Sequence, residues 1–216
     1  MTSILYTGLT VPKSLHEIGN VIHYPVIKVV PNNPQNESIQ KFYLLLDQST
    51  HLIFTSKTAV NLFFEWITEL GIGKIPQLIA VGKATADEIR KHTKIGIEVA
   101  DKETAEGVVA LLQEMTGEEK KLFLWPHSGQ ARSVITDYFE SIQAQYYDCI
   151  FYQVEVHKIE PKPDLSLISE VHFTSPSTVD GFFSIYGIPP GHMRVHCIGP
   201  VTKNYLEKKL FNFTMV

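Results

Sequence analysis

The sequence predicts an α/β protein of two domains, each built on a parallel sheet. Apolar runs such as LIAV (78–81) and LFLW (122–125) alternate with helical patterns, which is typical of parallel βαβ units. A segment of strand, turn and helix also occurs twice, as IFTSKTAVNLFF at 53–64 and as HFTSPSTVDGFF at 172–183. A repeat of this length indicates two related halves.

Length and composition limit the function classes. The chain has 216 residues, 44% of them hydrophobic, which suits one large or two small domains with a sizeable core. Its net charge is −4 and it has no block of basic residues, so we expect no nucleic-acid or membrane partner. No apolar stretch is long enough to be a signal peptide or a membrane span. Cys149 and Cys197 lie in apolar runs, so we expect buried free thiols in a soluble, cytoplasmic protein.

The N-terminal elements are short. Residues 3–7 predict a strand and residues 13–19 a brief helix. Residues 21–30 are rich in β-formers, and Pro25 marks them as an edge strand or an irregular one. Residues 31–38 form a turn-rich connector.

A regular alternation follows. We expect strands at 51–56, 77–82, 95–100, 121–126 and 147–157, and helices at 39–46, 58–71, 83–93, 103–115 and 129–143. After a proline-rich connector at 159–166 come strands at 171–175 and 194–199, helices at 178–187 and 201–210, and a short strand at 211–216.

The two halves of the repeat are unequal, and this predicts the domain boundaries. The second half lacks a strand, a helix and a long strand that the first half has at 121–157, and residues 3–30 resemble that missing piece. We therefore expect residues 1–29 and 158–216 to form a discontinuous first domain, because a domain completes its own sheet. Residues 34–151 would form an inserted second domain, joined by antiparallel linkers at about 28–34 and 152–158. A ligand would then bind in the cleft between the domains.

The carboxyl ends of the predicted strands carry hydroxyl groups and glycines where helices begin. Ligands of open parallel sheets bind at these ends, where free N–H groups and the helix dipole favour anions. Any one of these residues could serve merely as a helix cap. Six such turns together favour a ligand with several negative groups. The candidate binding residues are Thr55, Ser56, Thr58, Gly82, Thr85, Thr104, Ser128, Gly129, Ser175, Ser177 and Thr202.

Standard phosphate and metal motifs are absent. The sequence has neither GxxxxGK[ST] nor GxGxxG, so carboxylates are the expected anions. His192 and His196 are four residues apart, but the second lies in a strand pattern, so we expect no metal site.

Two further side chains are candidates for the site. Tyr152, at the predicted exit of the second domain, is either a proton donor or an interfacial aromatic. Arg132, in the first turn of its predicted helix, indicates an anionic partner, although a local pair with Asp137 or Glu140 would also explain it.

Seven ordered motifs resemble the uroporphyrinogen-III synthase family and cover most of the chain. They are IFTSKTAV, IAVGKATADEI, KETAEGVVALL, LWPHSGQAR, IFYQVEV, HFTSPSTV and CIGPVTKNYL. The resemblance implies two flavodoxin-like or similar α/β domains joined by a two-stranded β-ladder, the HemD-type fold. It also implies a cofactor-free lyase of haem and tetrapyrrole biosynthesis.

The substrate that the resemblance implies is hydroxymethylbilane, a linear polycarboxylate. Loss of its hydroxyl gives an azafulvene, and closure through a spiro intermediate inverts ring D to form uroporphyrinogen III. The alternative is a non-catalytic two-domain protein whose cleft binds a polycarboxylate or a tetrapyrrole. We expect a monomer, and a transient contact with hydroxymethylbilane synthase is left open.

Site residues carry over by motif. The family's tyrosine that assists departure of the hydroxyl falls on Tyr152. The cleft-lining threonines and serines fall on Thr85, Thr202, Ser56 and Ser175. Arg194 lies where family members can carry a basic residue. The first strand departs from the pattern, because it ends in Thr7-Gly8 where the family often has Thr-Arg, which removes a candidate carboxylate-binding cation.

Overall fold

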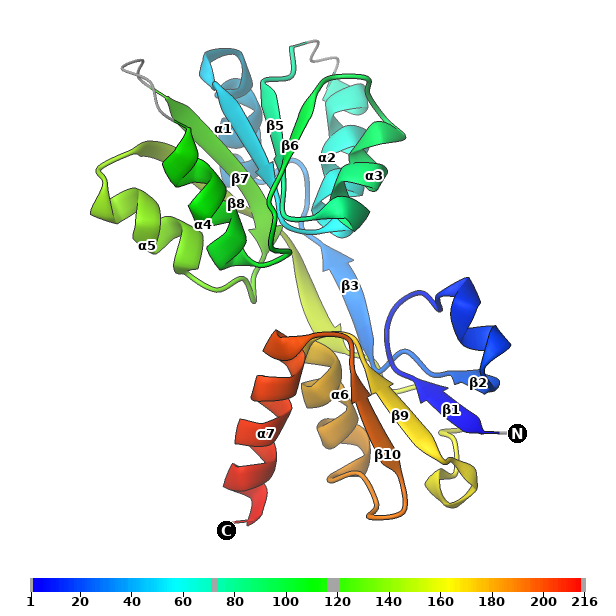
Figure 1. Cartoon of the computed structure of the whole chain (residues 1–216). Helices are drawn as coiled ribbons and strands as arrows, with labels where there is room; N and C mark the ends of the chain where they lie inside the picture. The colour runs from blue at the N-terminus through cyan, green and yellow to red at the C-terminus, as the bar shows by residue number, and fades with distance from the viewer. Residues whose placement is uncertain (1, 71–73, 116–120, 215–216) are drawn as a thin grey trace. The chain divides into compact units, whose positions relative to one another are not determined.

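Figure 1 shows a computed structural model of the chain, which describes residues 2–70, 74–115 and 121–214. The chain divides into two compact units. Unit 1 combines Met1–Val29 with Val154–Val216, and unit 2 is the continuous segment Val30–Gln153. There are two sheets rich in parallel pairs, so the protein belongs to the α/β class.

The sheet of unit 2 has six strands in the order β3-β8-β7-β4-β5-β6. They are β3 (Ile27–Pro31), β4 (His51–Phe54), β5 (Gln77–Ala80), β6 (Ile97–Val99), β7 (Leu122–Ser128) and β8 (Gln145–Val156). All pairs from β8 to β6 are parallel. The carboxyl ends of β4, β5 and β7 therefore lie at one edge of the sheet, and each is followed by residues that lead into a helix.

Helices cover both faces of this sheet (Figure 1). They are α1 (Glu37–Leu44), α2 (Lys57–Leu70), α3 (Lys83–Arg90), α4 (Ala105–Glu114) and α5 (Val134–Ser141). Ile53 of β4 belongs to the core under α4 and α5, where it lies with Val108 and Ile135. The next residue, Phe54, contacts Phe63 of α2 on the opposite face. Successive strand residues point to opposite faces, so a strand buried on both sides is apolar throughout, which is why HLIF shows no alternation.

The sheet of unit 1 combines both ends of the chain. Its four strands, in the order β10-β9-β1-β2, are β1 (Ser3–Tyr6), β2 (Asn20–His23), β9 (Glu170–Phe173) and β10 (Arg194–Cys197). All three pairs are parallel. Leu5, Val171 and Phe173 face a core shared with α6 (Pro176–Tyr186) and α7 (Pro200–Thr214). The opposite face has a smaller core around Ile4 and Tyr6, covered by Leu15 of the 3₁₀ helix η1 (Lys13–Glu17).

Strands β3 and β8 pair where the chain crosses between the units. The N–H of Asn32 donates to the oxygen of Phe151, and the N–H of His157 donates to the oxygen of Val26. One residue number rises as the other falls, so the two strands are antiparallel. Pro25 lies in the break between β2 and β3, which agrees with the irregular strand expected at 21–30.

Three local predictions differ from the structure. Residues 129–132 are not helical, because the N–H of Gly129 donates to the oxygen of Tyr152 and the N–H of Ala131 closes a turn on Ser128, so α5 begins at Val134. Residues 211–214 continue α7 instead of forming a strand, since Leu206 and Leu210 pack on the same core. Residues 13–17 form a 3₁₀ helix in place of a longer helix. The predicted helix end at 71 and the last two residues, 215–216, lie outside the described residues.

Both cysteines are free thiols. Cys149 is buried, whereas Cys197 is partly exposed, because β10 is an edge strand. In the described part of the chain, no helix is both long and apolar enough to span a bilayer.

Candidate functional site

Hydroxyl groups cap two of the helices that follow strands of unit 2, α2 and α4. Ser56 lies between β4 and α2, and its Oγ accepts a hydrogen bond of 3.0 Å from the N–H of Ala59. Thr104 caps α4, where its Oγ1 accepts 3.1 Å from the N–H of Gly107. Each hydroxyl thus satisfies one free N–H and leaves others at the same helix start for a ligand.

Tyr152 of β8 lies among three of the predicted hydroxyl residues. Its phenol donates a 2.9 Å hydrogen bond to the Oγ of Ser56. Ser128 pairs with Tyr152 in the β7–β8 register, where a β-bulge shifts the strands. Burial raises the pKa of the Tyr152 phenol, and hydrogen bonds with Ser56, Ser128 and Thr58 offset part of that rise. The phenol therefore stays protonated at neutral pH, as a proton donor must.

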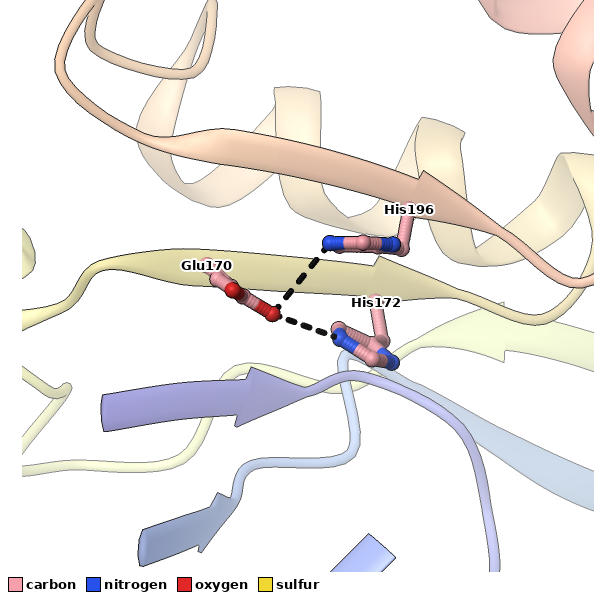
Figure 2. Close-up of side chains that lie close together, drawn as sticks. All are labelled: Glu170, His172 and His196. Carbon is pink, nitrogen blue, oxygen red and sulfur yellow. Dashed lines mark hydrogen bonds and ion pairs between the residues drawn. The ribbon is translucent and has the colours of Figure 1, made fainter. Parts of the chain in front are cut away.

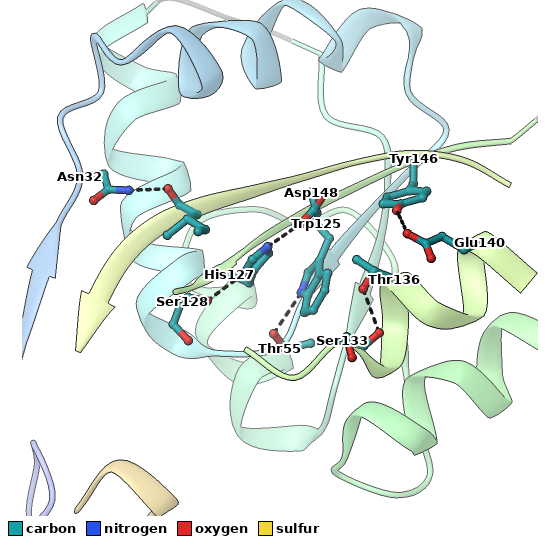
Figure 3. Close-up of polar contacts among 11 residues, drawn as sticks. Asn32, Thr55, Trp125, His127, Ser128, Ser133, Thr136, Glu140, Tyr146 and Asp148 are labelled. Atoms are coloured by element: carbon teal, nitrogen blue, oxygen red, sulfur yellow. Dashed lines mark hydrogen bonds and ion pairs between the residues drawn. The ribbon is translucent and has the colours of Figure 1, made fainter. Parts of the chain in front are cut away.

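Thr55, beside this cluster, has a structural partner. Its Oγ1 accepts a 3.1 Å hydrogen bond from the indole N–H of Trp125 (Figure 3). Trp125 is buried, and this contact satisfies its one polar atom. The side chain of Thr55 therefore helps to hold β4 against β7. Its hydroxyl oxygen already accepts one hydrogen bond and is less available to a ligand.

His127 of β7 lies between two oxygen acceptors. Its Nδ1 is 2.8 Å from the backbone oxygen of Ser128, and its Nε2 is 3.1 Å from Oδ2 of Asp148 (Figure 3). The hydrogen bond from His127 holds the pKa of Asp148 below its usual range despite burial.

The sequence did not predict this His127–Asp148 pair. Its members lie on neighbouring strands, 21 residues apart. The order of elements allowed β7 and β8 to be neighbours. The sequence did not show the register of their pairing, which decides whether the two side chains meet.

The start of α3 already binds a carboxylate. Oε1 of Glu103 accepts a 2.8 Å hydrogen bond from the N–H of Lys83, the first residue of α3. Gly82 caps this helix without a side chain, and a Cβ there would lie 2.5 Å from the Glu103 carboxyl carbon. Thr85 is buried one turn further along. The helix start at Lys83 therefore donates a backbone N–H to the carboxylate of Glu103, a partner that the sequence did not reveal. Binding of an external anion there stays a prediction.

Arg132 is positioned differently from the prediction. It lies before α5, not in its first turn, and its partner is neither Asp137 nor Glu140. Its NH1 and NH2 donate to the two carboxylate oxygens of Glu106 on α4, at 2.6 and 3.0 Å. This contact lowers the pKa of Glu106 to about 2. Arg132 is thus already neutralised by a carboxylate, because a bidentate pair between two neighbouring segments outcompetes a local helical pair.

Gly129 has a backbone role. Its N–H donates 2.9 Å to the oxygen of Tyr152, and a Cβ at this position would lie 2.0 Å from Oε1 of Gln153. The absence of a side chain lets the turn after β7 approach β8 next to the Tyr152 cluster.

In unit 1 the equivalent hydroxyls also cap helices. Ser175 and Thr178 form a reciprocal capping box at the start of α6. The Oγ atoms of Ser175 and Ser177 are 2.8 Å apart. Thr202 is buried in the first turn of α7. The repeated turns therefore have the same local structure in both units, a strand followed by a capped helix start.

Arg194 does not lie with these residues. It is the first residue of β10 and pairs in register with Glu170, the first residue of β9. Its guanidinium contacts the Glu170 carboxylate. Since Ser175 and Thr202 follow the other ends of these strands, the expectation that Arg194 joins them is wrong. A short strand of four residues is enough to separate its two ends by about 10 Å.

The residues that could hold a metal are also different from those considered in the sequence. His192 contacts a backbone oxygen of Leu165. His196 instead lies beside His172 and Glu170, and these three form the group of potential ligands found among the described residues.

The comparisons with known proteins agree with this architecture. A family model, "Uroporphyrinogen-III synthase HemD", matches residues 15–215. A mutant uroporphyrinogen III synthase from the extreme thermophile Thermus thermophilus superposes with a TM-score of 0.65 at 14% identity, covering 96% of this chain and 89% of that one. The uroporphyrinogen-III synthetase of Helicobacter pylori gives 0.65 at 17% identity, with 97% and 89% covered.

A second crystal form from the same Thermus species, the wild-type synthase, gives a TM-score of 0.54 at 14% identity, covering 96% of this chain and 88% of that one. At these identities the superpositions show a shared two-domain fold. A search of curated proteins found no match. The family model covers nearly the whole described chain, and the chain therefore belongs to the uroporphyrinogen-III synthase HemD family.

Proposed function

We propose that this protein is a uroporphyrinogen-III synthase. It would convert hydroxymethylbilane into uroporphyrinogen III and water, with inversion of ring D. The observation that carries the proposal is the buried phenol of Tyr152, held among hydroxyl groups at the strand ends of a chain of this family. A neutral proton donor in polar surroundings suits the elimination of a hydroxyl group.

The first step needs one proton. The phenol of Tyr152 donates it to the departing hydroxyl, the carbon–oxygen bond breaks, and water leaves as the pyrrole nitrogen's electrons form the azafulvene, which keeps its N–H and carries a positive charge. After closure on ring D, fragmentation and re-closure, the new pyrrole loses one proton from carbon. That proton restores the phenol, so the net change is the loss of one water. Ser56 accepts from the phenol at 2.9 Å in the free protein. When the phenol donates to the substrate instead, the Ser56 hydroxyl would turn and donate to the phenol oxygen.

Carboxylate binding would come from backbone amides at helix starts. The contact between Glu103 and the N–H of Lys83 supports this, because it has the geometry that a substrate carboxylate would need. Ser56 and Thr104 in unit 2 and Ser175 in unit 1 mark further helix starts with the same chemistry.

Selectivity would come from the conformation of the substrate. Unassisted closure of the bilane gives the type I isomer, so the protein has to favour attack at the substituted carbon of ring D over the free one. Binding energy from several carboxylates can restrain the chain in the conformation that reacts. This requires no cofactor, and we propose a cofactor-free reaction by a monomer.

The test is to add freshly prepared hydroxymethylbilane to the full chain and to measure the isomer ratio of the oxidised porphyrins. We expect the type III isomer to dominate in proportion to protein concentration. A product that remains type I while the protein binds the bilane would refute the enzyme and favour the non-catalytic carrier. Sedimentation of the same sample measures whether the active species is a monomer.

A further inference from the structure

Unit 1 carries a cluster of two imidazoles and one carboxylate that the proposed reaction does not use. Glu170 and His172 are two residues apart on β9, so their side chains point to the same face of the sheet. His196 of β10 pairs in register with His172. Figure 2 shows the three side chains converging above these two strands. The core of α6 and α7 lies on the opposite face, where Val171 and Phe173 point.

The distances within the cluster match metal coordination. Oε2 of Glu170 is 3.3 Å from Nε2 of His172 and 3.2 Å from Nε2 of His196. All three atoms lie within 4.8 Å of one another. Zinc binds such atoms at about 2.0–2.2 Å, which places tetrahedral ligands roughly 3.3 Å apart. Two of the three separations therefore suit a bound ion as they are, and the third is within 4.8 Å.

The cluster is open to solvent on one side, and a neighbouring side chain holds its carboxylate in place. The side chains of Glu170 and His172 are 10% and 18% exposed, whereas that of His196 is 51% exposed, which leaves an open side for a water ligand. The guanidinium of Arg194 contacts Oε1, the carboxylate oxygen that faces neither histidine. Such an outer contact fixes a carboxylate as a ligand through its other oxygen.

We propose that Glu170, His172 and His196 bind a divalent zinc ion that joins β9 to β10. Two imidazoles, one carboxylate and a water make a ligand set that zinc accepts, and magnesium and calcium prefer oxygen ligands alone. The two strands come from opposite ends of the α6 segment, so the ion would stabilise the edge of the unit 1 sheet. The Tyr152 cluster is in unit 2 and shares no residue with this site.

The experiment measures zinc binding by the full chain, produced without a polyhistidine tag. Isothermal titration is expected to give one ion per chain, and Co²⁺ to give the visible bands of tetrahedral coordination. His196→Ala is expected to weaken binding at least tenfold and to remove those bands. The matched control is His192→Ala. This histidine is in the same unit, is exposed, and its imidazole contacts the backbone oxygen of Leu165.

The outcomes separate a metal site from an ion-pair cluster. No stoichiometric binding to the folded chain, unchanged binding in His196→Ala, or an equal loss in His192→Ala would each overturn the proposal. Glu170→Gln adds a second test, with the expectation of weaker binding. If this buried substitution prevents folding, the comparison of His196→Ala with His192→Ala still decides, since both side chains are on the surface.

Discussion

Replacing Tyr152 by Phe removes one oxygen atom from the proposed site and leaves the ring. The ring is buried, with 6% of the residue exposed, so phenylalanine can occupy the same space. The substitution removes the hydroxyl that donates a hydrogen bond to Ser56. This hydroxyl is also the group that we assign as proton donor. We expect kcat to fall and KM to change little, because in the proposed mechanism other groups, the backbone amides at helix starts, bind the substrate carboxylates.

The size of the effect follows from the acidity of the donor. A positioned general acid contributes about 10²–10⁴-fold, and the most effective ones have a pKa near the working pH. Burial raises the pKa of Tyr152 above that of an ordinary phenol, so it is a weak acid at neutral pH. We therefore expect a loss near the lower limit, about 100-fold in kcat, which corresponds to about 2.7 kcal/mol.

Stability changes should be much smaller than this. Losing one buried hydrogen bond costs about 0.5–1.5 kcal/mol. The matched control is Tyr147→Phe, on the same strand, which loses a 3.1 Å hydrogen bond to the oxygen of Ser38 and no contact at the proposed site. The assay is single-turnover formation of type III product from fresh bilane, with urea unfolding of each variant.

Two results would refute the reasoning about Tyr152. Full activity in Tyr152→Phe would exclude the phenol as the proton donor. An equal loss in Tyr147→Phe would show that the effect comes from disturbance of β8. A drop in activity that follows the loss of folded protein in the unfolding curves would likewise point to stability and not to proton transfer.

Three further variants test neighbouring parts of the argument. Thr85→Ala should lower kcat/KM only a few-fold, as expected for one hydrogen bond of about 1 kcal/mol among several, measured in the same assay. Gly107→Ala should destabilise the fold by about 1–3 kcal/mol in urea unfolding, because its Cβ would lie 2.0 Å from a backbone oxygen. The control is Gly96→Ala, since a Cβ at Gly96 meets nothing within 4 Å. The pKa of Glu106 is about 2 in the folded protein, below its unfolded value of about 4.3. The pair with Arg132 therefore stabilises the folded protein fully at pH values above the unfolded pKa. This stabilisation is lost as the pH falls toward 2. This exposed pair should contribute about 0.2–1 kcal/mol, and Arg132→Gln should reduce that acid-side dependence.

Each of these expectations can fail clearly. A loss of activity in Thr85→Ala as large as that in Tyr152→Phe would give the threonine a central role. Equal stability of Gly107→Ala and Gly96→Ala would mean that the backbone near α4 adjusts. An unchanged acid-side slope in Arg132→Gln would show that the ion pair does not form in solution.

Much of the fold could be predicted from the order of residues. The repeat of IFTSKTAVNLFF as HFTSPSTVDGFF predicted two units with the same strand, turn and helix, and β4–α2 and β9–α6 have that structure. Apolar runs such as LIAV predicted strands buried on both faces, because only such strands lack alternation. A strand was expected at 211–216 because FNFT has a strand-like composition, and this expectation is wrong for residues 211–214. These residues continue α7, whose Leu206 and Leu210 pack on the core of unit 1.

The candidate site was predicted only in part. The helix-capping alternative for Ser56, Thr104 and Ser175 is what the structure shows, because capping is local and requires one hydroxyl just before a helix. Their role in binding a ligand stays a prediction. For Arg132 the sequence indicated an anionic partner and left a local pair open, but it did not reveal Glu106, which lies 26 residues away with no helical spacing to connect them. Arg194 was correctly expected at the start of its strand, but it pairs with Glu170 there and does not join the hydroxyl groups at the other end of the sheet.

The sequence by itself thus determined the α/β class, the internal repeat and the capped helix starts. The class and the caps follow from patterns within about fifteen residues, the range over which period and capping act, and the repeat follows from comparing two such segments. Only the tertiary structure decided which side chains from separate strands meet. Strand order and register brought the phenol of Tyr152 to Ser56 across 96 residues, and brought His172 and Glu170 to His196. Pairing between distant strands fixes these contacts, and a shift of one residue would turn each side chain to the opposite face.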